Sequence, residues 1–286
     1  MADFRVHPSR IFGCLKLAVA AVFLYVSGFA LASPAPQRVA DPHYGMALYS
    51  YHQGLFFEAL TRLSVAKAEG GIAGHGDHPL LVEGGLMLAY GMVREAGTLF
   101  RALLEESDIP EETRNRAWFY LGKVLWLERN PDASSEALAR VNGQLLKGSD
   151  QSLYEEWLYL QGQALLAQPD GPQATKSLDD ILQKLPNASP WAWYLRYNRA
   201  VQWLSAGNTQ SAIEQLKNLA LPGLPGEDKL PPGLAAELTA LEQQARLTLG
   251  RLYLGKGSPE RALNTLADIP LDGFLSDQAL FDYAVA

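Results

Sequence analysis

Two histidines and an aspartate within four residues form the stretch of this chain best suited to metal chemistry. His75, Asp77 and His78 stand directly before Pro79 in the segment GHGDHP. Imidazole nitrogens and carboxylate oxygens bind zinc well, but a tetrahedral site takes three or four ligands, and residues 71–73 supply no others. We favour a structural interpretation, in which Asp77 or His78 caps a helix that begins at Pro79. A metal site at His75, Asp77 and His78 is kept as the alternative.

Other sequence patterns for catalysis or cofactor binding are absent. The chain contains no G-x-S-x-G motif, and it has no glycine-rich phosphate loop of either common type. Paired acids such as Glu105-Glu106 and Glu155-Glu156 fall within expected helices, where a solvated face is the simpler explanation. We therefore expect no enzymatic activity and no cofactor.

The segment 1–32 has the layout of a secretory signal peptide. Basic residues precede an apolar run over 17–31, and Ala30-Leu31-Ala32 forms an A-x-A cleavage motif before Ser33. The run is shorter than the roughly 20 residues that span a bilayer. With the disulfide-free chain that follows, this layout predicts cleavage and export to a bacterial periplasm. The alternative is an anchor formed by an uncleaved N-terminal helix.

Charge and cysteine content limit the classes of partner. The 286 residues carry a net charge of −7, and cleavage would remove Asp3 and three basic residues, which makes the charge −9. Cleavage would also remove Cys14, the only cysteine, so disulfides are not part of the expected fold. An acidic chain is poorly suited to binding nucleic acid or anionic lipid by bulk electrostatics. We expect neither partner once the signal segment is removed.

After a flexible lead over 33–42, a two-helix pattern recurs six times. Each unit has a small residue on its first helix, a second small residue twelve positions later, and a large apolar residue four positions further on. The first small residues are Ala47, Gly84, Gly122, Gly162, Ala200 and Gly250. The second are Ala59, Ala96, Ser134, Ala174, Ala212 and Ala262, and the large residues are Leu63, Phe100, Leu138, Leu178, Leu216 and Leu266. This double spacing predicts antiparallel helices that touch at the small residues.

The last full unit shows the family resemblance best. In Gln244–Leu266, Leu249-Gly250 is followed by Tyr253, then by the turn Gly257-Ser258-Pro259, Ala262 and Leu266. This order resembles the tetratricopeptide repeat (TPR), which implies an all-α fold over 43–286: a right-handed α-solenoid of antiparallel helix pairs. Successive units are spaced more widely than the repeat period of that family. We therefore expect the extra residues in loops, including a Pro/Gly-rich loop at 221–233.

Two local features complete the repeat prediction. Glycines that favour a positive φ stand at the inter-helix turn of four units, and the third and fourth units lack them. These glycines are Gly54, Gly91, Gly207 and Gly257. Phe274–Ala286 reads as the first helix of a truncated seventh unit, with Ala284 as its small residue.

The TPR resemblance also implies a function. First helices of the family line a concave groove that receives a protein or an extended peptide. Carried onto this chain, the groove residues are Tyr44, Tyr51, Phe119, Lys123, Trp126, Tyr159, Tyr197 and Arg251. Packing of these aromatic side chains between units is the alternative. We expect a non-enzymatic scaffold for protein partners in cell-envelope assembly or secretion, or else the recruiting N-terminal part of a larger exported protein.

Overall fold

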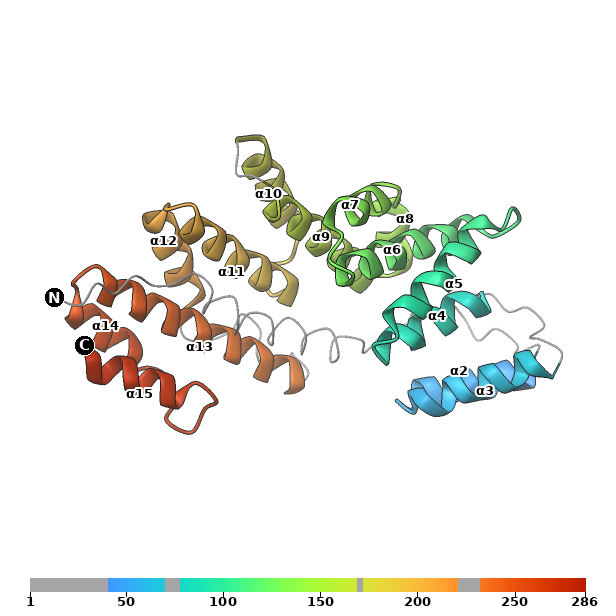
Figure 1. Cartoon of the computed structure of the whole chain (residues 1–286), viewed down its shortest axis with the longest axis horizontal. Coiled ribbons are helices and arrows are strands. Elements are labelled where there is room, and N and C mark those ends of the chain that lie inside the picture. Colours follow the sequence, from blue (N-terminus) through green and yellow to red (C-terminus); the bar gives the residue numbers. More distant parts are fainter. Residues whose placement is uncertain (1–40, 70–77, 169–171, 221–231) are drawn as a thin grey trace. The chain divides into compact units, whose positions relative to one another are not determined.

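The computed structural model describes residues 41–69, 78–168, 172–220 and 232–286. Every regular element in these ranges is an α-helix, which confirms the all-α prediction (Figure 1). These residues form two compact units, 41–164 and 165–286, and each is described by itself. The signal-like segment, His75 and Asp77, and nearly all of the Pro/Gly-rich loop lie outside the described residues.

Eight helices occupy the first unit, counting α9, whose last two residues belong to the second. They are α2 (Pro42–His52), α3 (Phe56–Ala68), α4 (Pro79–Ala89), α5 (Val93–Glu105), α6 (Glu111–Leu127), α7 (Pro131–Ala139), α8 (Gly143–Ser149) and α9 (Gln151–Leu166). Helices α2 and α3, α4 and α5, and α6 and α7 pack as the expected pairs, and α5 also packs on α6. The first helix starts inside the lead predicted over 33–42, because the Asp41 side chain accepts hydrogen bonds from the N–H groups of His43 and Tyr44.

The second unit continues the same arrangement. Its helices are α10 (Pro172–Lys184), α11 (Pro190–Ser205), α12 (Thr209–Leu219), α13 (Pro232–Gly255), α14 (Pro259–Leu266) and α15 (Ser276–Val285). Helices α11 and α12 form one pair, α13 and α14 another, and α12 also packs on α13. The last helix, α15, contacts both α13 and α14.

The predicted spacing of small and large residues determines how the helices of a pair meet. A Cβ atom added to Gly84 would lie 2.6 Å from the Phe100 ring, and one added to Gly122 or Gly250 would lie 2.6 Å from the leucine sixteen positions later. No side chain larger than hydrogen fits at such a distance without displacing its neighbour. All six first-helix small residues and all six large apolar residues are buried. The spacing thus identified the inter-helix contacts of the second, third and sixth units correctly.

The inter-helix turns share one hydrogen-bonding pattern. Each of the four turn glycines has a positive φ between 67° and 82°, and the N–H of the next residue donates to a carbonyl five residues back. This is the Schellman motif, in which a left-handed residue ends the helix. In the third unit Arg129 takes the glycine's place with a φ of 61°, and the N–H of Asn130 donates to Leu125. The unit keeps the turn geometry without the glycine.

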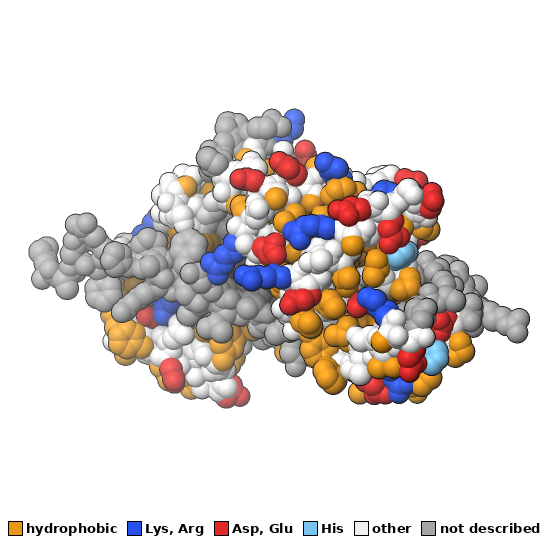
Figure 2. Space-filling model, turned by 45° about the vertical axis from the view of Figure 1, so that its right-hand side comes forward, with side chains coloured by type: hydrophobic (Ala, Val, Ile, Leu, Met, Phe, Trp, Pro, Cys, Tyr) orange, Lys and Arg blue, Asp and Glu red, His pale blue; other side chains and the backbone are white. Residues whose placement is uncertain are grey.

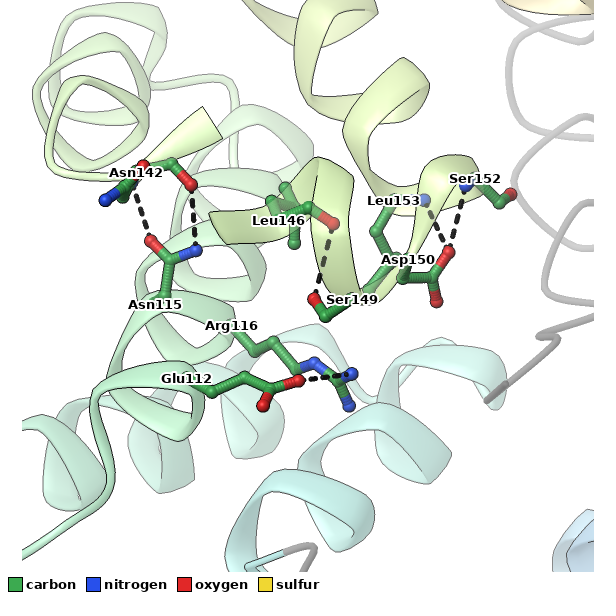
Figure 3. A network of polar contacts seen from close by, with 9 residues as sticks. All are labelled: Glu112, Asn115, Arg116, Asn142, Leu146, Ser149, Asp150, Ser152 and Leu153. Carbon is green, nitrogen blue, oxygen red and sulfur yellow. Dashed lines mark hydrogen bonds and ion pairs between the residues drawn. The ribbon is translucent and has the colours of Figure 1, made fainter. Parts of the chain in front are cut away.

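Helix α8 is a structured insertion where the spacing predicted loop residues. The Asn115 amide exchanges two hydrogen bonds with the Asn142 backbone, at 3.1 Å and 2.7 Å (Figure 3). The Asn142 side chain caps α8, and the Asp150 side chain caps α9 by accepting from the N–H groups of Ser152 and Leu153. Leu146 of α8 is fully buried. The extra residues therefore form a capped helix that packs on α6.

Candidate protein-interaction surfaces

His78 acts as a helix cap, as the favoured interpretation predicted. It is the N-cap residue of α4, and its Nδ1 accepts a long hydrogen bond of 3.4 Å from the N–H of Leu80. Its Nε2 lies 3.3 Å from a carboxylate oxygen of Glu106. Within the described ranges, no cluster of three or more His, Cys, Asp or Glu side chains is arranged to hold a metal ion. Because His75 and Asp77 fall outside those ranges, the metal alternative stays a prediction.

Most of the residues predicted to line a groove are instead packed inside the repeats. Five are buried: Tyr44, Phe119, Lys123, Tyr159 and Tyr197. Tyr51 and Trp126 are half-buried, and only Arg251 is exposed. The physical reason is the stacking of consecutive helix pairs, which covers one face of each first helix. These five side chains are packed inside the repeats of this structure, the groove stays a prediction, and Trp126 remains its best candidate.

The two charged residues of the predicted groove, Lys123 and Arg251, form ion pairs within the fold. Lys123 Nζ on α6 lies 2.6 Å from Glu156 Oε1 on α9, and both side chains are more than nine-tenths buried. Burial raises the pKa of Tyr120 well above its ordinary value, and Tyr51 and Glu156 add smaller contributions. Arg251 lies 2.5 Å from Asp282 and bonds Gln278, which attaches α13 to α15. These charges hold helices together, and a partner would have to displace an internal ion pair to reach them.

Exposed apolar side chains instead gather at the turns of the first two units. Leu55 and Phe57 follow the α2–α3 turn, while Tyr90 and Met92 flank the glycine of the α4–α5 turn. They are 51%, 68%, 45% and 36% exposed. The rings of Phe57 and Tyr90 meet edge to face with centroids 6.1 Å apart, so the two turns lie side by side. We call these four residues the turn patch; hydrophobic side chains also gather on the visible face of these N-terminal helices (right-hand side of Figure 2).

The turn patch has no counterpart in the later units. Leu55 and Met92 share one repeat position, where the third, fifth and sixth units have Asn130, Asn208 and Ser258. The position of Phe57 is occupied by Arg94, Asp132, Gln210 and Glu260 in the second, third, fifth and sixth units. Stacking therefore does not require apolar residues there. Sequence reasoning followed the helix faces and missed this patch, although aligning the turns of the six units would have shown it.

A shallow depression lies between α10 and α11. It is lined by Asp179, Leu182, Gln183, Leu185, Pro186, Asn187 and Arg196. Arg196 donates to the Asn187 side chain at 2.9 Å, and Trp193 donates to the Asn187 carbonyl at 3.0 Å. Burial lowers the pKa of Arg196. Asp179 is bound to Arg199 at 2.6 Å, so the polar groups of the depression hold its own walls together.

The comparisons with known proteins support the fold. The sequence matches no protein-family model, and no curated protein matches it. Among solved structures the chain is similar to the assembly chaperone of RpL4, Acl4 (residues 1–338). The identity is 18% and the TM-score 0.50, over 85% of this chain and 94% of Acl4. The chain thus has a TPR-like helical-repeat fold. None of the helices in the ranges that the structure describes is long and apolar enough to cross a membrane.

Proposed function

We propose that this chain is a non-enzymatic scaffold that binds partner proteins, with the turn patch as a contact surface. The carrying observation is that four apolar residues are exposed at these turns, whereas the positions of Leu55, Phe57 and Met92 have polar residues in the third, fifth and sixth units. Contiguous exposed apolar side chains mark interaction sites more often than they serve the fold. Tyrosine is also enriched among residues that dominate binding energy, and burying aromatic rings contributes much of an interface's stability.

The proposed location is the bacterial periplasm, where the chain would act in cell-envelope assembly or secretion as a divergent exported TPR protein. Support comes from the sequence of residues 1–32, with its basic start, apolar run and A-x-A motif. The absence of cysteine from residues 33–286 is compatible with an oxidising compartment. Recovery of the protein in the periplasmic fraction with Ser33 at its N-terminus is the result that this location requires.

An assembly chaperone for a basic client is a second candidate. Acl4 is described as the assembly chaperone of another protein, RpL4, and it shares this fold. The observation that favours a similar role here is the net charge of −7, because an acidic surface attracts and solubilises a basic partner. Both candidates require a protein-binding surface, and they differ in whether the partner is released after assembly.

Site-specific photo-crosslinking in living cells tests the proposal. A photoreactive amino acid would replace Leu55 or Met92, and in matched controls it would replace Asn208 or Ser258, which occupy the same repeat position. None of the four side chains makes a cap hydrogen bond, so folding should be unaffected. We expect one defined partner to crosslink at 55 and 92 only. Equal yields at all four positions, or none at 55 and 92, would contradict the turn patch as a binding surface.

A further inference from the structure

A half-buried arginine in the second unit has no negatively charged partner. Arg196 on α11 donates one hydrogen bond, at 2.9 Å, to the side-chain oxygen of Asn187, and it forms no ion pair with any described residue. Each other described arginine that is not exposed binds a carboxylate or several backbone carbonyl groups. These arginines are Arg62, Arg114, Arg116, Arg199 and Arg246. A guanidinium group has five N–H groups to donate, so most of those on Arg196 are left without a partner in this part of the chain.

The sixth unit shows how an arginine at the same repeat position is neutralised. Arg246 occupies the position of Arg196, and its guanidinium lies 2.7 Å from carboxylate oxygens of both Glu242 and Asp268. The residues of the fifth unit at the positions of these two acids are Ala192 and Asn218. Burial lowers the pKa of Arg196, as expected for a cation that is partly removed from water without a counter-charge. Packing of the repeat therefore does not account for the charge on Arg196.

The groups around Arg196 form a surface rich in N–H donors. Arg196 lines the depression between α10 and α11, which has a volume of about 520 Å³. Gln183 and Asn187 line it too, and the amide N–H groups of both side chains donate to no described residue. The carboxylate of Asp179 lies in the same lining but is bound to Arg199 at 2.6 Å. The depression therefore presents unused donors and a net positive charge, which suits an anionic group.

The charge balance favours a carboxylate over a phosphate. A carboxylate carries one negative charge, and it accepts two parallel hydrogen bonds from a guanidinium group. A phosphate group carries nearly two negative charges, which Arg196 alone would not neutralise on a chain whose net charge is already −7. The anion that fits is therefore a carboxylate.

The rest of the depression is apolar and is held in place. Leu182, Leu185 and Pro186 line it beside the polar groups. The indole N–H of Trp193 donates to the Asn187 carbonyl at 3.0 Å, which fixes the turn before α11. The volume of the depression falls within the range of sites that hold small ligands, and a site ordered in advance loses less entropy on binding. The ligand should therefore carry an apolar group next to its carboxylate.

We propose that the depression between α10 and α11 binds a carboxylate that lies beside an apolar group, carried as an acidic side chain on a segment of a partner protein. The carboxylate accepts hydrogen bonds from the Arg196 guanidinium, with the amides of Gln183 and Asn187 as further donors. The apolar group lies against Leu182 and Pro186. This site belongs to the second compact unit, goes beyond the proposed function and does not depend on the turn patch.

A short peptide titrated into the isotope-labelled full chain tests the proposal by NMR. The probe is acetyl-Leu-Glu-Leu-amide, whose only carboxylate is the glutamate side chain, and its control is acetyl-Leu-Gln-Leu-amide. The indole N–H signal of Trp193 reports binding, because this group contacts the turn that carries Asn187. The variant Arg196→Met removes the charge. Its matched control is Arg261→Met, since Arg261 on α14 is exposed and has no ion pair among the described residues.

We expect the glutamate peptide to bind the wild type with a sub-millimolar Kd and to bind Arg196→Met at least about tenfold more weakly, because a hydrogen bond to a charged group contributes that much. Arg261→Met should bind like the wild type, and circular dichroism should show wild-type helicity in both variants. The glutamine peptide should bind the wild type at least about tenfold more weakly, a comparison that needs no variant to fold. Equal binding of the two peptides to the wild type, or of the glutamate peptide to Arg196→Met, would overturn the proposal.

N-acetyl-leucine distinguishes the two sources of such a carboxylate. It joins a free carboxylate to one apolar side chain, and we expect it to bind more weakly than the glutamate peptide because it covers less of the depression. Binding as tight as that of the peptide would overturn a protein segment as the source and would assign the site to a small carboxylic acid.

Discussion

Gly84 and Gly85 are neighbours on α4 with opposite surroundings. A Cβ on Gly84 would lie 2.6 Å from the Phe100 ring, whereas a Cβ on Gly85 would meet nothing within 4 Å. Alanine normally stabilises a helix interior by up to about 1 kcal/mol relative to glycine, but overpacking a core costs about 1–3 kcal/mol. We predict that Gly84→Ala lowers the free energy of unfolding and that Gly85→Ala raises it, as measured in urea. Two equally stable variants would contradict the close approach of α4 and α5.

Arg129 has a backbone conformation that is adopted by a glycine at the equivalent turn of four other units. Its φ of 61° lies in the left-handed region. A side chain in that region costs roughly 1 kcal/mol or more. We predict that Arg129→Gly raises the free energy of unfolding by about 0.5–1 kcal/mol. Loss of stability in Arg129→Gly would show that the arginine side chain contributes more than its backbone costs.

Gly54→Ala is the reciprocal control for Arg129→Gly. A Cβ on Gly54 would meet nothing within 4 Å, so only the positive φ of 74° opposes the new methyl group. Alanine at a positive φ destabilises a fold even where space is free. Gly54→Ala should therefore lower the free energy of unfolding in the same urea experiment.

At the scale of elements, a buried ion pair joins α6 to α9. Removing one partner leaves the other charge buried without compensation, which costs about 3–5 kcal/mol, while replacing both with apolar residues is often neutral. We predict a loss of about 3 kcal/mol for Lys123→Met, and recovery of most of it when Glu156→Leu is added. Chemical unfolding of both single variants and the double variant measures this coupling. A loss below about 1 kcal/mol for Lys123→Met would show that the pair is solvated.

A carboxylate makes the contact between α11 and α13 sensitive to pH. Burial raises the pKa of Glu237 from its ordinary value of 4.5, although the hydrogen bond donated by Tyr194 at 2.5 Å opposes the shift. Since the folded state holds this proton more tightly than the unfolded state, its stabilising contribution is present in acid and is lost as pH rises through the folded pKa. We predict that Glu237→Gln is more stable than wild type at pH 7. The gain should shrink as the pH falls through the raised folded pKa of Glu237 and should be gone below the ordinary pKa of 4.5, and thermal unfolding at several pH values measures it.

The helix pairs were predictable from sequence because their determinants are local. A small residue, a turn and a large residue lie within seventeen positions, so one unit specifies its own contact. Helix α8 was not predictable in this way, because the hydrogen bonds between Asn115 and Asn142 join residues 27 positions apart. The burial of Phe119 and Tyr159 likewise depends on neighbouring units. Spacing along one helix cannot distinguish a face that stacks from a face that binds.

At the scale of the whole molecule, the repeats leave apolar surface exposed at two places. The turn patch lies on the first two helix pairs, and the apolar side chains of Leu280 and Phe281 are exposed on α15. The turn patch is specific to its position in the series, since the positions of Leu55, Phe57 and Met92 have polar residues in the third, fifth and sixth units. Repeat proteins require only neighbouring contacts for stability, so surface residues are free to differ from unit to unit. The differences between units are therefore the best guide to binding.

The central claim is that the turn patch binds the partner, and that the residues predicted to line a groove on the first helices do not. The most direct measurement is the yield of partner protein that crosslinks in cells to the double variant Phe57→Ser/Tyr90→Ser and to Trp126→Ala. Each yield is compared with that of the wild type. The unfolding of each variant must also be compared with that of the wild type. Our account predicts that the double variant loses the partner while remaining as stable as the wild type, and that Trp126→Ala retains it. Loss of the partner in Trp126→Ala alone would contradict the account and would support the predicted groove instead.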